Sequence, residues 1–165
     1  MATSRKLSAV GRLLAAFEAE NIRFTLIGMS AAIVQGVMES TFDVDLWIDL
    51  PSRQYMRLQN IALRQGGAMG ATTVTYLADG TPVNFVFEVH GLGSFAAESR
   101  HTRLMRFHGL KVPVLKLERI LKSKETIRRD KDLAHIIHIK NLLRCRRSGN
   151  KAPKTSRKPK RRPPR

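Results

Sequence analysis

The segment from Phe24 to Pro51 carries the clearest pattern of hydrophobic and polar positions in the chain. From Asp43 to Asp49, acidic or aromatic residues alternate with the aliphatic residues of the sequence DVDLWID. A period of two is typical of a strand with one buried and one open face. Asp43 and Asp45 would then project from the same face, with their Cα atoms about 6.6 Å apart.

Two interpretations of this acidic pair follow from its spacing. Carboxylates so placed can converge on one hard cation such as Mg²⁺, which takes oxygen ligands in octahedral geometry. Alternatively, they form the solvated face of an amphipathic strand.

The residues before the acidic strand predict a strand followed at once by a helix. Residues 24–27 are short, apolar and β-favouring, and Gly28 opens a helix-compatible run from Ser30 to Val37. A glycine at such a turn lets the backbone approach a ligand, and the free N–H groups of a new helix attract phosphate. The Ser30 hydroxyl could add a donor there. A turn that can bind phosphate, followed by a pair of acids that can bind a metal ion, suits one ligand, a nucleoside triphosphate with Mg²⁺.

The remaining sequence alternates predicted helices and strands. Apolar residues at helical spacing predict helices over residues 7–17, 53–65, 117–126 and 132–143. β-favouring runs predict strands over residues 72–77, 83–89, 104–107 and 111–115, and Asp79-Gly80 predicts a hairpin between the first two. In the last helix, Leu133, Ile136 and Ile137 are predicted to form the buried stripe.

Composition adds limits on size and environment. The chain has 165 residues, the size of one domain, and its apolar runs are shorter than the eighteen or so residues of a membrane span, so no membrane association is expected. The single cysteine, Cys145, excludes an internal disulfide. We therefore expect a protein of a reducing compartment, the cytoplasm.

The net charge of +17 is concentrated at the C-terminal end. The segment from Arg144 to Arg165 holds 11 of the 30 Lys and Arg residues and none of the 13 acids. Residues from Ser148 onward include four of the seven prolines and no aromatic residue. This composition predicts a folded domain over residues 1–147 and a disordered basic tail over residues 148–165. Such a tail attracts nucleic acid without reading its sequence, or it serves only as a solubilising extension.

Two sequence blocks resemble a known superfamily. The motif G-x-S-A at residues 28–31, followed by T-x-D-V-D-L-W at residues 41–47, resembles the signature of the DNA polymerase β-like nucleotidyltransferases. The likeness is to their small stand-alone bacterial members, including toxin-associated ones. The sequences LKVPVLKLE at 110–118, LKSK at 121–124 and RDKDLA at 129–134 resemble the helix pair that closes those proteins. The resemblance covers roughly residues 7–143 and implies an α/β (α+β) fold, a mixed sheet flanked by helices with further helices at the C-terminal end.

The resemblance also implies roles for particular residues. Asp43 and Asp45 would bridge Mg²⁺ to the phosphates of an NTP substrate. Gly28 and Ser30 would hold the triphosphate. Lys124, the best match among the basic residues of the closing helices, would face the phosphates across the cleft, although a solvated basic helix face is an equal alternative.

One position departs from the superfamily pattern. A third carboxylate usually lies on the strand predicted over residues 83–89, and Asn84 takes this position here. An amide can ligate a metal through its oxygen, but it lacks the charge and basicity of a carboxylate. Glu88 projects from the same face but lies about 13 Å along the strand, which makes it a poor substitute.

These observations leave three interpretations of function. The resemblance implies transfer of a nucleotidyl group from an NTP to an acceptor hydroxyl, on RNA such as a tRNA according to the positive charge, or on a protein. Asn84, together with Met29 where the superfamily has Gly or Ser, favours a second interpretation. In it, the protein has lost the reaction and acts as a nucleic-acid-binding or toxin–antitoxin component. The third places the function in the basic tail. Whether the protein is an enzyme stays open at this point.

Overall fold

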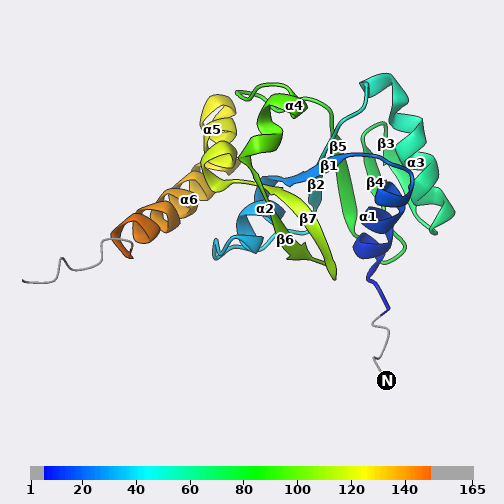
Figure 1. The fold of residues 1–165 in the computed structure, drawn as a ribbon, viewed down its shortest axis with the longest axis horizontal. Helices are drawn as coiled ribbons and strands as arrows, with labels where there is room; N and C mark the ends of the chain where they lie inside the picture. The colour runs from blue at the N-terminus through cyan, green and yellow to red at the C-terminus, as the bar shows by residue number, and fades with distance from the viewer. Residues whose placement is uncertain (1–5, 150–165) are drawn as a thin grey trace, which may run out of the picture.

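A mixed sheet of seven strands forms the centre of the computed structural model, which describes residues 6–149 (Figure 1). Its strand order is β3-β4-β5-β2-β1-β7-β6. β1 pairs antiparallel with β2 and parallel with β7, and β2 pairs parallel with β5. The strands are β1 (Phe24–Ile27), β2 (Val44–Ile48), β3 (Ala68–Ala71), β4 (Val74–Tyr76), β5 (Pro82–Val86), β6 (Thr102–Phe107) and β7 (Leu110–Leu115).

Within residues 6–149, six α-helices surround this sheet. They are α1 (Ala9–Ala19), α2 (Gly28–Val34), α3 (Tyr55–Arg64), α4 (Phe95–Glu98), α5 (Leu117–Ile127) and α6 (Asp130–Gly149), with 3₁₀ turns at Ser52–Gln54 and Ser99–His101. In Figure 1, α1 and α3 lie together at one end of the sheet, and α5 and α6 lie at the other. The predicted α/β fold with a mixed sheet flanked by helices and C-terminal helices is confirmed.

The core lies between α1 and the sheet. The fully buried ring of Phe17 in α1 lies 6.1 Å from the ring of Phe24 in β1 and 6.0 Å from that of Phe85 in β5. Apolar residues of β2 that project to the same side, Leu46 and Ile48, are also buried. This face of the sheet is therefore sealed by packing, which leaves the other face for the polar side chains of β2 and β5.

The segment between α2 and β2 lies against α6. The Gln35 amide donates hydrogen bonds to the main-chain oxygens of Ala31 and Leu115, both at 2.9 Å. Arg146 of α6 donates to the main-chain oxygen of Gln35, and His138 of α6 lies 2.6 Å from a Glu39 carboxylate oxygen. The long last helix therefore runs beside the chain that leads into the acidic strand.

The predicted buried stripe of the last helix is wrong at two of its three positions. Leu133 and Ile137 are 42% and 56% exposed, whereas Ile136 is buried. The buried side of α6 consists of Asp132, Ile136, Ile139 and Leu143. The helix is rotated relative to the prediction because a charged residue, Asp132, occupies the buried side at its first turn.

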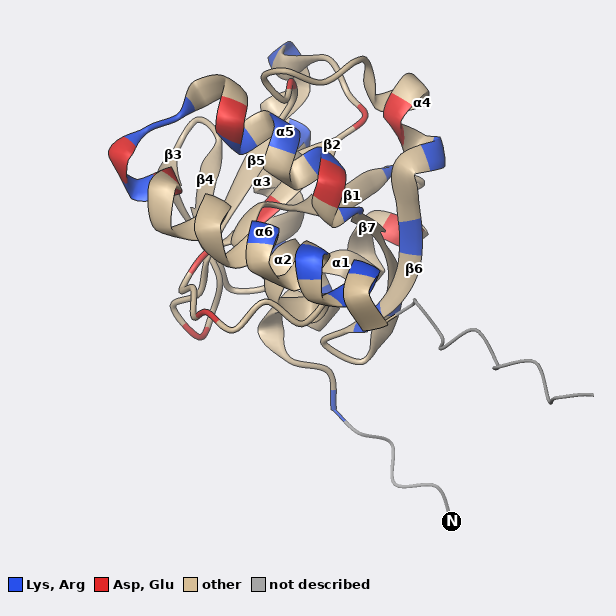
Figure 2. Cartoon of the chain, turned by 90° about the vertical axis from the view of Figure 1, so that its left-hand side faces the viewer, with Lys and Arg blue, Asp and Glu red and all other residues tan. Residues whose placement is uncertain are grey.

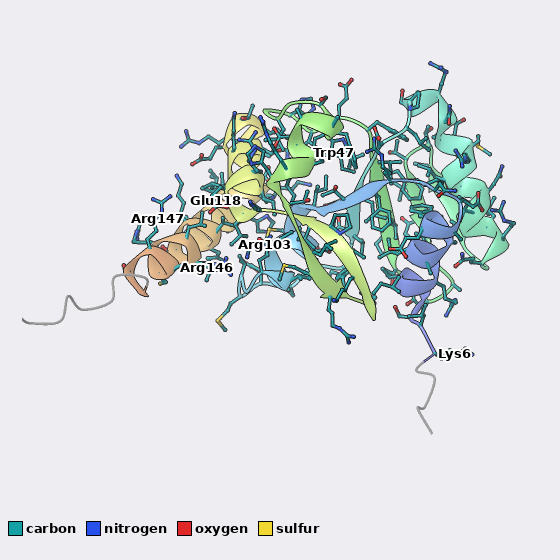
Figure 3. The ribbon with its side chains drawn as sticks, in the orientation of Figure 1. Lys6, Trp47, Arg103, Glu118, Arg146 and Arg147 are labelled. Carbon is teal, nitrogen blue, oxygen red and sulfur yellow. The ribbon has the colours of Figure 1, made fainter. Side chains whose placement is uncertain are left out.

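The expectation of an open face along all of β2 is also wrong at Trp47. Its indole is only 2% exposed, lies edge-on 5.5 Å from the ring of Phe95 in α4, and donates to the main-chain oxygen of Phe87 at 3.2 Å. α4 therefore covers this end of the strand, and the polar face narrows to the region around Asp45 (Figure 3 labels Trp47).

The remaining predictions concern the hairpin, the edge of the sheet and the C-terminal segment. The Asp79-Gly80 hairpin is confirmed, with Gly80 at φ 85° between antiparallel β4 and β5, whereas the exposed edge strand β3 was not predicted. Ser148 and Gly149 belong to α6, and the rest of the predicted tail, residues 150–165, lies outside the described residues, as do residues 1–5. Within residues 6–149, none of the helices has the length and apolar character needed to cross a membrane.

Candidate functional site

The two aspartates meet Asn84 at the polar face of the sheet. Parallel pairing of β2 with β5 sets Asp45 directly opposite Asn84. The Asn84 amide nitrogen donates to one oxygen of Asp45 at 2.7 Å and to one oxygen of Asp43 at 3.2 Å. Both carboxylates therefore contact the same amide, so the structure brings these three sequence-predicted residues together, while their roles stay predictions.

Asp43 is held in place by two hydroxyl groups. The Thr41 hydroxyl donates to a carboxylate oxygen of Asp43 at 2.6 Å, and the Ser30 hydroxyl donates to its main-chain oxygen at 2.8 Å. Ser30 is only 6% exposed. In this structure the Ser30 hydroxyl therefore joins α2 to the start of β2, and its contact with a phosphate stays a prediction.

Gly28 lies directly beneath Asp45. It follows β1 without any intervening residue and has φ 65°, a left-handed conformation that favours glycine. A Cβ atom at this position would overlap the Oδ2 oxygen of Asp45. The glycine turn and the acidic strand thus lie at one place, and the need for glycine arises first from the close approach of Asp45.

The pKa of Asp45 is raised above its ordinary value. Burial is the main cause, and the charge of Asp43 adds to it. The hydrogen bond from Asn84 and the positive charges of Lys124 and Lys131 lower the pKa but do not cancel the effect. The influence of these two lysines indicates that α5 and α6 bring positive charge to the site, and the raised pKa of Asp45 reflects chiefly the removal of its carboxylate from water.

A second charged cluster lies at the junction of α5 and α6. Asp132 is 1% exposed and accepts hydrogen bonds from Lys124 Nζ and Arg129 Nε, both at 2.8 Å. Burial alone would raise the pKa of Asp132, but the bonds from Arg129 and Lys124 outweigh it and lower the pKa from 3.8 to about 2. One carboxylate thus holds two cations in place, and the three groups together keep one positive charge.

His135 completes this cluster. Its Nδ1 lies 3.3 Å from Lys124 Nζ. Burial lowers the pKa of His135, and the charge of Lys124 lowers it further. A neutral imidazole with Nδ1 unprotonated can accept a hydrogen bond from Lys124 Nζ, which helps to fix the direction of the lysine. Sequence reasoning missed the roles of Asp132 and His135, although the signal was present in the run of opposite charges around Asp132.

A pocket of about 340 Å³ brings several predicted residues together. Gly28, Asp45 and Lys124 line it, along with Arg129 and Glu88. Glu88, which the spacing along the strand made a poor substitute for a third carboxylate, therefore borders the same cavity as Asp45. This volume falls within the range of small-molecule sites.

Asp43 and Ser30 border a different cavity. This second pocket, of about 430 Å³, is also lined by Thr41, Phe42 and Phe107. The carboxylate pair therefore lies between two pockets. The pocket lined by Lys124 and Arg129 is the more basic of the two.

The donor set at the carboxylate pair fits a hard divalent cation. One oxygen of Asp45 and one of Asp43 lie 2.7 and 3.2 Å from the same Asn84 nitrogen, and the side-chain amide of Asn84 also carries an oxygen that can ligate a hard cation. Among residues 6–149 no cluster of three or more His, Cys, Asp or Glu side chains is arranged to hold a metal. A cation here would accordingly depend on Asp43, Asp45 and the amide oxygen of Asn84.

Comparison by sequence finds no matching family model and no matching curated protein. Comparison of structures finds similar folds. A candidate nucleotidyltransferase from Thermotoga maritima matches with a TM-score of 0.50 and 17% identity, over 84% of this chain and 91% of that one.

Two further structures are enzymes of antibiotic modification. ANT(2″)-Ia, solved in complex with adenylyl-2″-tobramycin, matches with a TM-score of 0.54 and 16% identity over 85% of this chain and 90% of that one. The lincosamide antibiotic adenylyltransferase LnuA, bound to lincomycin, matches with a TM-score of 0.55 and 12% identity over 81% and 96%. The chain therefore has the nucleotidyltransferase fold, and the low identities extend the likeness no further than the fold.

Proposed function

We propose that this protein binds an NTP with Mg²⁺ and transfers the nucleotidyl group to an acceptor hydroxyl. The observation that carries the proposal is that the Asp43 and Asp45 carboxylates contact the same Asn84 amide, while Asp45 also lines a pocket with Gly28, Lys124 and Arg129. This combination suits a triphosphate with a bound metal ion, because the two carboxylates can bind the cation and the two basic side chains can neutralise the phosphates.

In the proposed reaction the acceptor oxygen attacks the α-phosphorus, an O–P bond forms, and the bond to the bridging oxygen breaks so that pyrophosphate leaves. Mg²⁺, when bound, would neutralise the charge that develops on the phosphates. Asp43 and Asp45 would hold it, and Lys124 and Arg129 would stabilise the leaving pyrophosphate. The hydroxyl proton passes to solvent or to another base, because the amide of Asn84 has no basicity.

For the acceptor, we propose a hydroxyl of RNA. The support is the net charge of +17, which favours a polyanion over a cationic acceptor. Two of the structural neighbours were solved with an antibiotic or its adenylylated form, lincomycin and adenylyl-2″-tobramycin, so a small molecule with a free hydroxyl is the comparison to include in any assay.

Asn84 favours a second candidate function. Its amide donates to both carboxylates and so stabilises the acidic pair without any cation. A protein of this fold that binds but does not react could act as a nucleic-acid-binding or toxin–antitoxin component. This candidate predicts nucleic acid binding that persists after Asp43→Ala, and no label transfer by the natural chain.

Incubation with α-labelled NTPs, Mg²⁺ and RNA separates the two candidates. Label transfer by the natural chain that Asp43→Ala abolishes, and that the exposed-acid control Asp79→Asn retains, supports catalysis. Transfer only after Asn84→Asp supports the second candidate. If neither chain transfers label to RNA or to small hydroxyl compounds, and calorimetry shows no Mg²⁺-dependent NTP binding, the nucleotide proposal is wrong.

A further inference from the structure

The folded part of the chain is itself divided by charge. Residues 100–149 carry 15 Lys and Arg against four acids, whereas residues 6–99 carry six against nine. The basic half consists of β6, β7, α5 and α6. Figure 2 shows Lys and Arg on α6 and on β6 at the side that faces the viewer. The second half of the folded chain therefore carries much of the positive charge, in addition to the basic residues that follow it in the sequence.

Four exposed arginines of this basic half lie on β6 and on the end of α6. Arg103 lies on β6, and Arg144, Arg146 and Arg147 lie near the end of α6; Figure 3 labels all but Arg144. Arg144 and Arg147 are three positions apart, on one side of the helix, and neither has an acidic partner within residues 6–149. We refer to these four arginines as the basic face. Their charges remain available to a polyanion.

The segment beside the basic face exposes two large apolar side chains. Arg146 and His138 of α6 hold Gln35 and Glu39, and within the same segment Met38 is 93% exposed and Phe42 is 91% exposed. These are the two most exposed large hydrophobic residues of the described chain. A phenyl ring so open to water contributes nothing to the core, and it immediately precedes Asp43.

We propose that single-stranded nucleic acid binds across this surface, with its phosphates on the basic face and one base stacked on Phe42. Arginines supply affinity for the backbone, and an open aromatic ring supplies a platform that any base can use. A protein partner would bury Phe42 equally well, but it would leave the neighbouring arginines without compensating charge. Since Phe42 and Asp43 line the same cavity of about 430 Å³, a base stacked on Phe42 would bring its ribose toward the Asp43 carboxylate. That last step alone rests on the proposed transfer reaction.

Fluorescence anisotropy with a short labelled single-stranded RNA tests the aromatic part of this surface. The full chain is titrated in EDTA without nucleotide, so that the outcome does not depend on catalysis. Phe42→Leu keeps an apolar side chain but removes the ring, and we expect it to raise Kd about tenfold, whereas Phe42→Trp restores binding. The affinity for a duplex RNA of the same sequence should change little on substitution of Phe42, because the bases of a duplex are not free to stack on the ring. Equal affinity of Phe42→Leu and the natural chain for the single strand overturns the stacking contact.

The salt dependence tests the basic face separately from the tail, which is present in every variant. Arg144→Gln with Arg147→Gln should lower the slope of log Kd against log salt by about 1.4, or about 0.7 for each phosphate of a single strand that the protein no longer neutralises. The matched control, Arg53→Gln with Arg57→Gln, neutralises two exposed arginines of the acidic half and should leave the slope unchanged. If both double variants lower the slope by the same amount, the attraction is diffuse and has no defined surface, which would overturn the proposal.

Discussion

The buried carboxylate of Asp132 gives the sharpest test of the charged cluster between α5 and α6. Asp132→Asn keeps the size of the side chain and removes its charge. Lys124 and Arg129 then lose their common partner, and Lys124, whose side chain is only 12% exposed, keeps its charge in a poorly solvated place. The expected result is a large loss of stability from a single isosteric change.

The magnitude follows from two observations. Lowering the pKa of Asp132 from 3.8 to about 2 corresponds to about 2 kcal/mol of folding free energy at neutral pH. Removing one partner of a buried pair costs about 3–5 kcal/mol when the other charge stays buried. Arg129 is half exposed and can be hydrated, so we expect Asp132→Asn to lower the free energy of unfolding by about 2–4 kcal/mol.

Urea unfolding at neutral pH measures this loss. The matched control is Asp130→Asn, an exposed acid in the same first turn of α6, which shares the favourable position near the helix N-terminus but has no buried partner. We expect the control to stay within about 0.5 kcal/mol of the natural chain.

The pH dependence gives a second, independent check. Because the folded pKa of Asp132 lies below the unfolded value, its stabilisation is fully present above the unfolded pKa and disappears as pH falls through the folded one. The difference between the natural chain and Asp132→Asn should therefore be constant near neutrality and shrink between about pH 4 and pH 2. Equal urea midpoints for the two chains, or a difference that ignores pH, would refute the assigned ion cluster.

Three further predictions concern the acidic pair. Gly28→Ala should weaken Mg²⁺ binding in calorimetry and lower the unfolding midpoint, because its Cβ displaces the Asp45 carboxylate; unchanged Mg²⁺ affinity would contradict this geometry. Ser30→Ala should cost about 1–3 kcal/mol by leaving the main-chain oxygen of Asp43 without its donor, and a melting temperature equal to that of the natural chain would show that the bond does not matter. Since the pKa of Asp45 is raised, Mg²⁺ affinity should increase as pH rises through that pKa, and a pH-independent affinity would place the cation elsewhere.

The elements around the site follow closely from local sequence pattern. The alternation around Asp45 predicted β2, and Gly28 after an apolar run predicted the direct passage from β1 to α2. Both signals depend on residues next to one another in the chain. The pairing of Asp45 with Asn84 could be predicted only from the resemblance of the whole segment to known proteins. The alternation of residues indicates which face of a strand a side chain occupies, but it does not indicate which other strand lies beside it.

What the sequence could not supply depends on contacts between distant elements. Trp47 becomes buried only because α4 covers it, and α6 is rotated because Asp132 finds two cations from its own vicinity and from α5. Neither contact leaves a trace in the hydrophobic pattern, which counts a charged residue as exposed. The Ser30 hydroxyl was interpreted from its place at a helix start, although its bond partner, the main-chain oxygen of Asp43, has no signal in the pattern of side chains.

Asn84 decides what a cation does at this site. With a carboxylate in its place, three negative charges would converge and folding would itself favour a bound cation, since like charges so close raise each other's pKa. The amide instead donates a hydrogen bond to each aspartate, and its bond to Asp45 lowers the pKa of Asp45 against the effects of burial and of Asp43. The acidic pair is thus hydrogen-bonded without metal. If Mg²⁺ binds as proposed and takes the amide oxygen of Asn84 as a ligand, the amide has to turn over and give up these two hydrogen bonds, and the free energy of that change lowers the affinity for Mg²⁺.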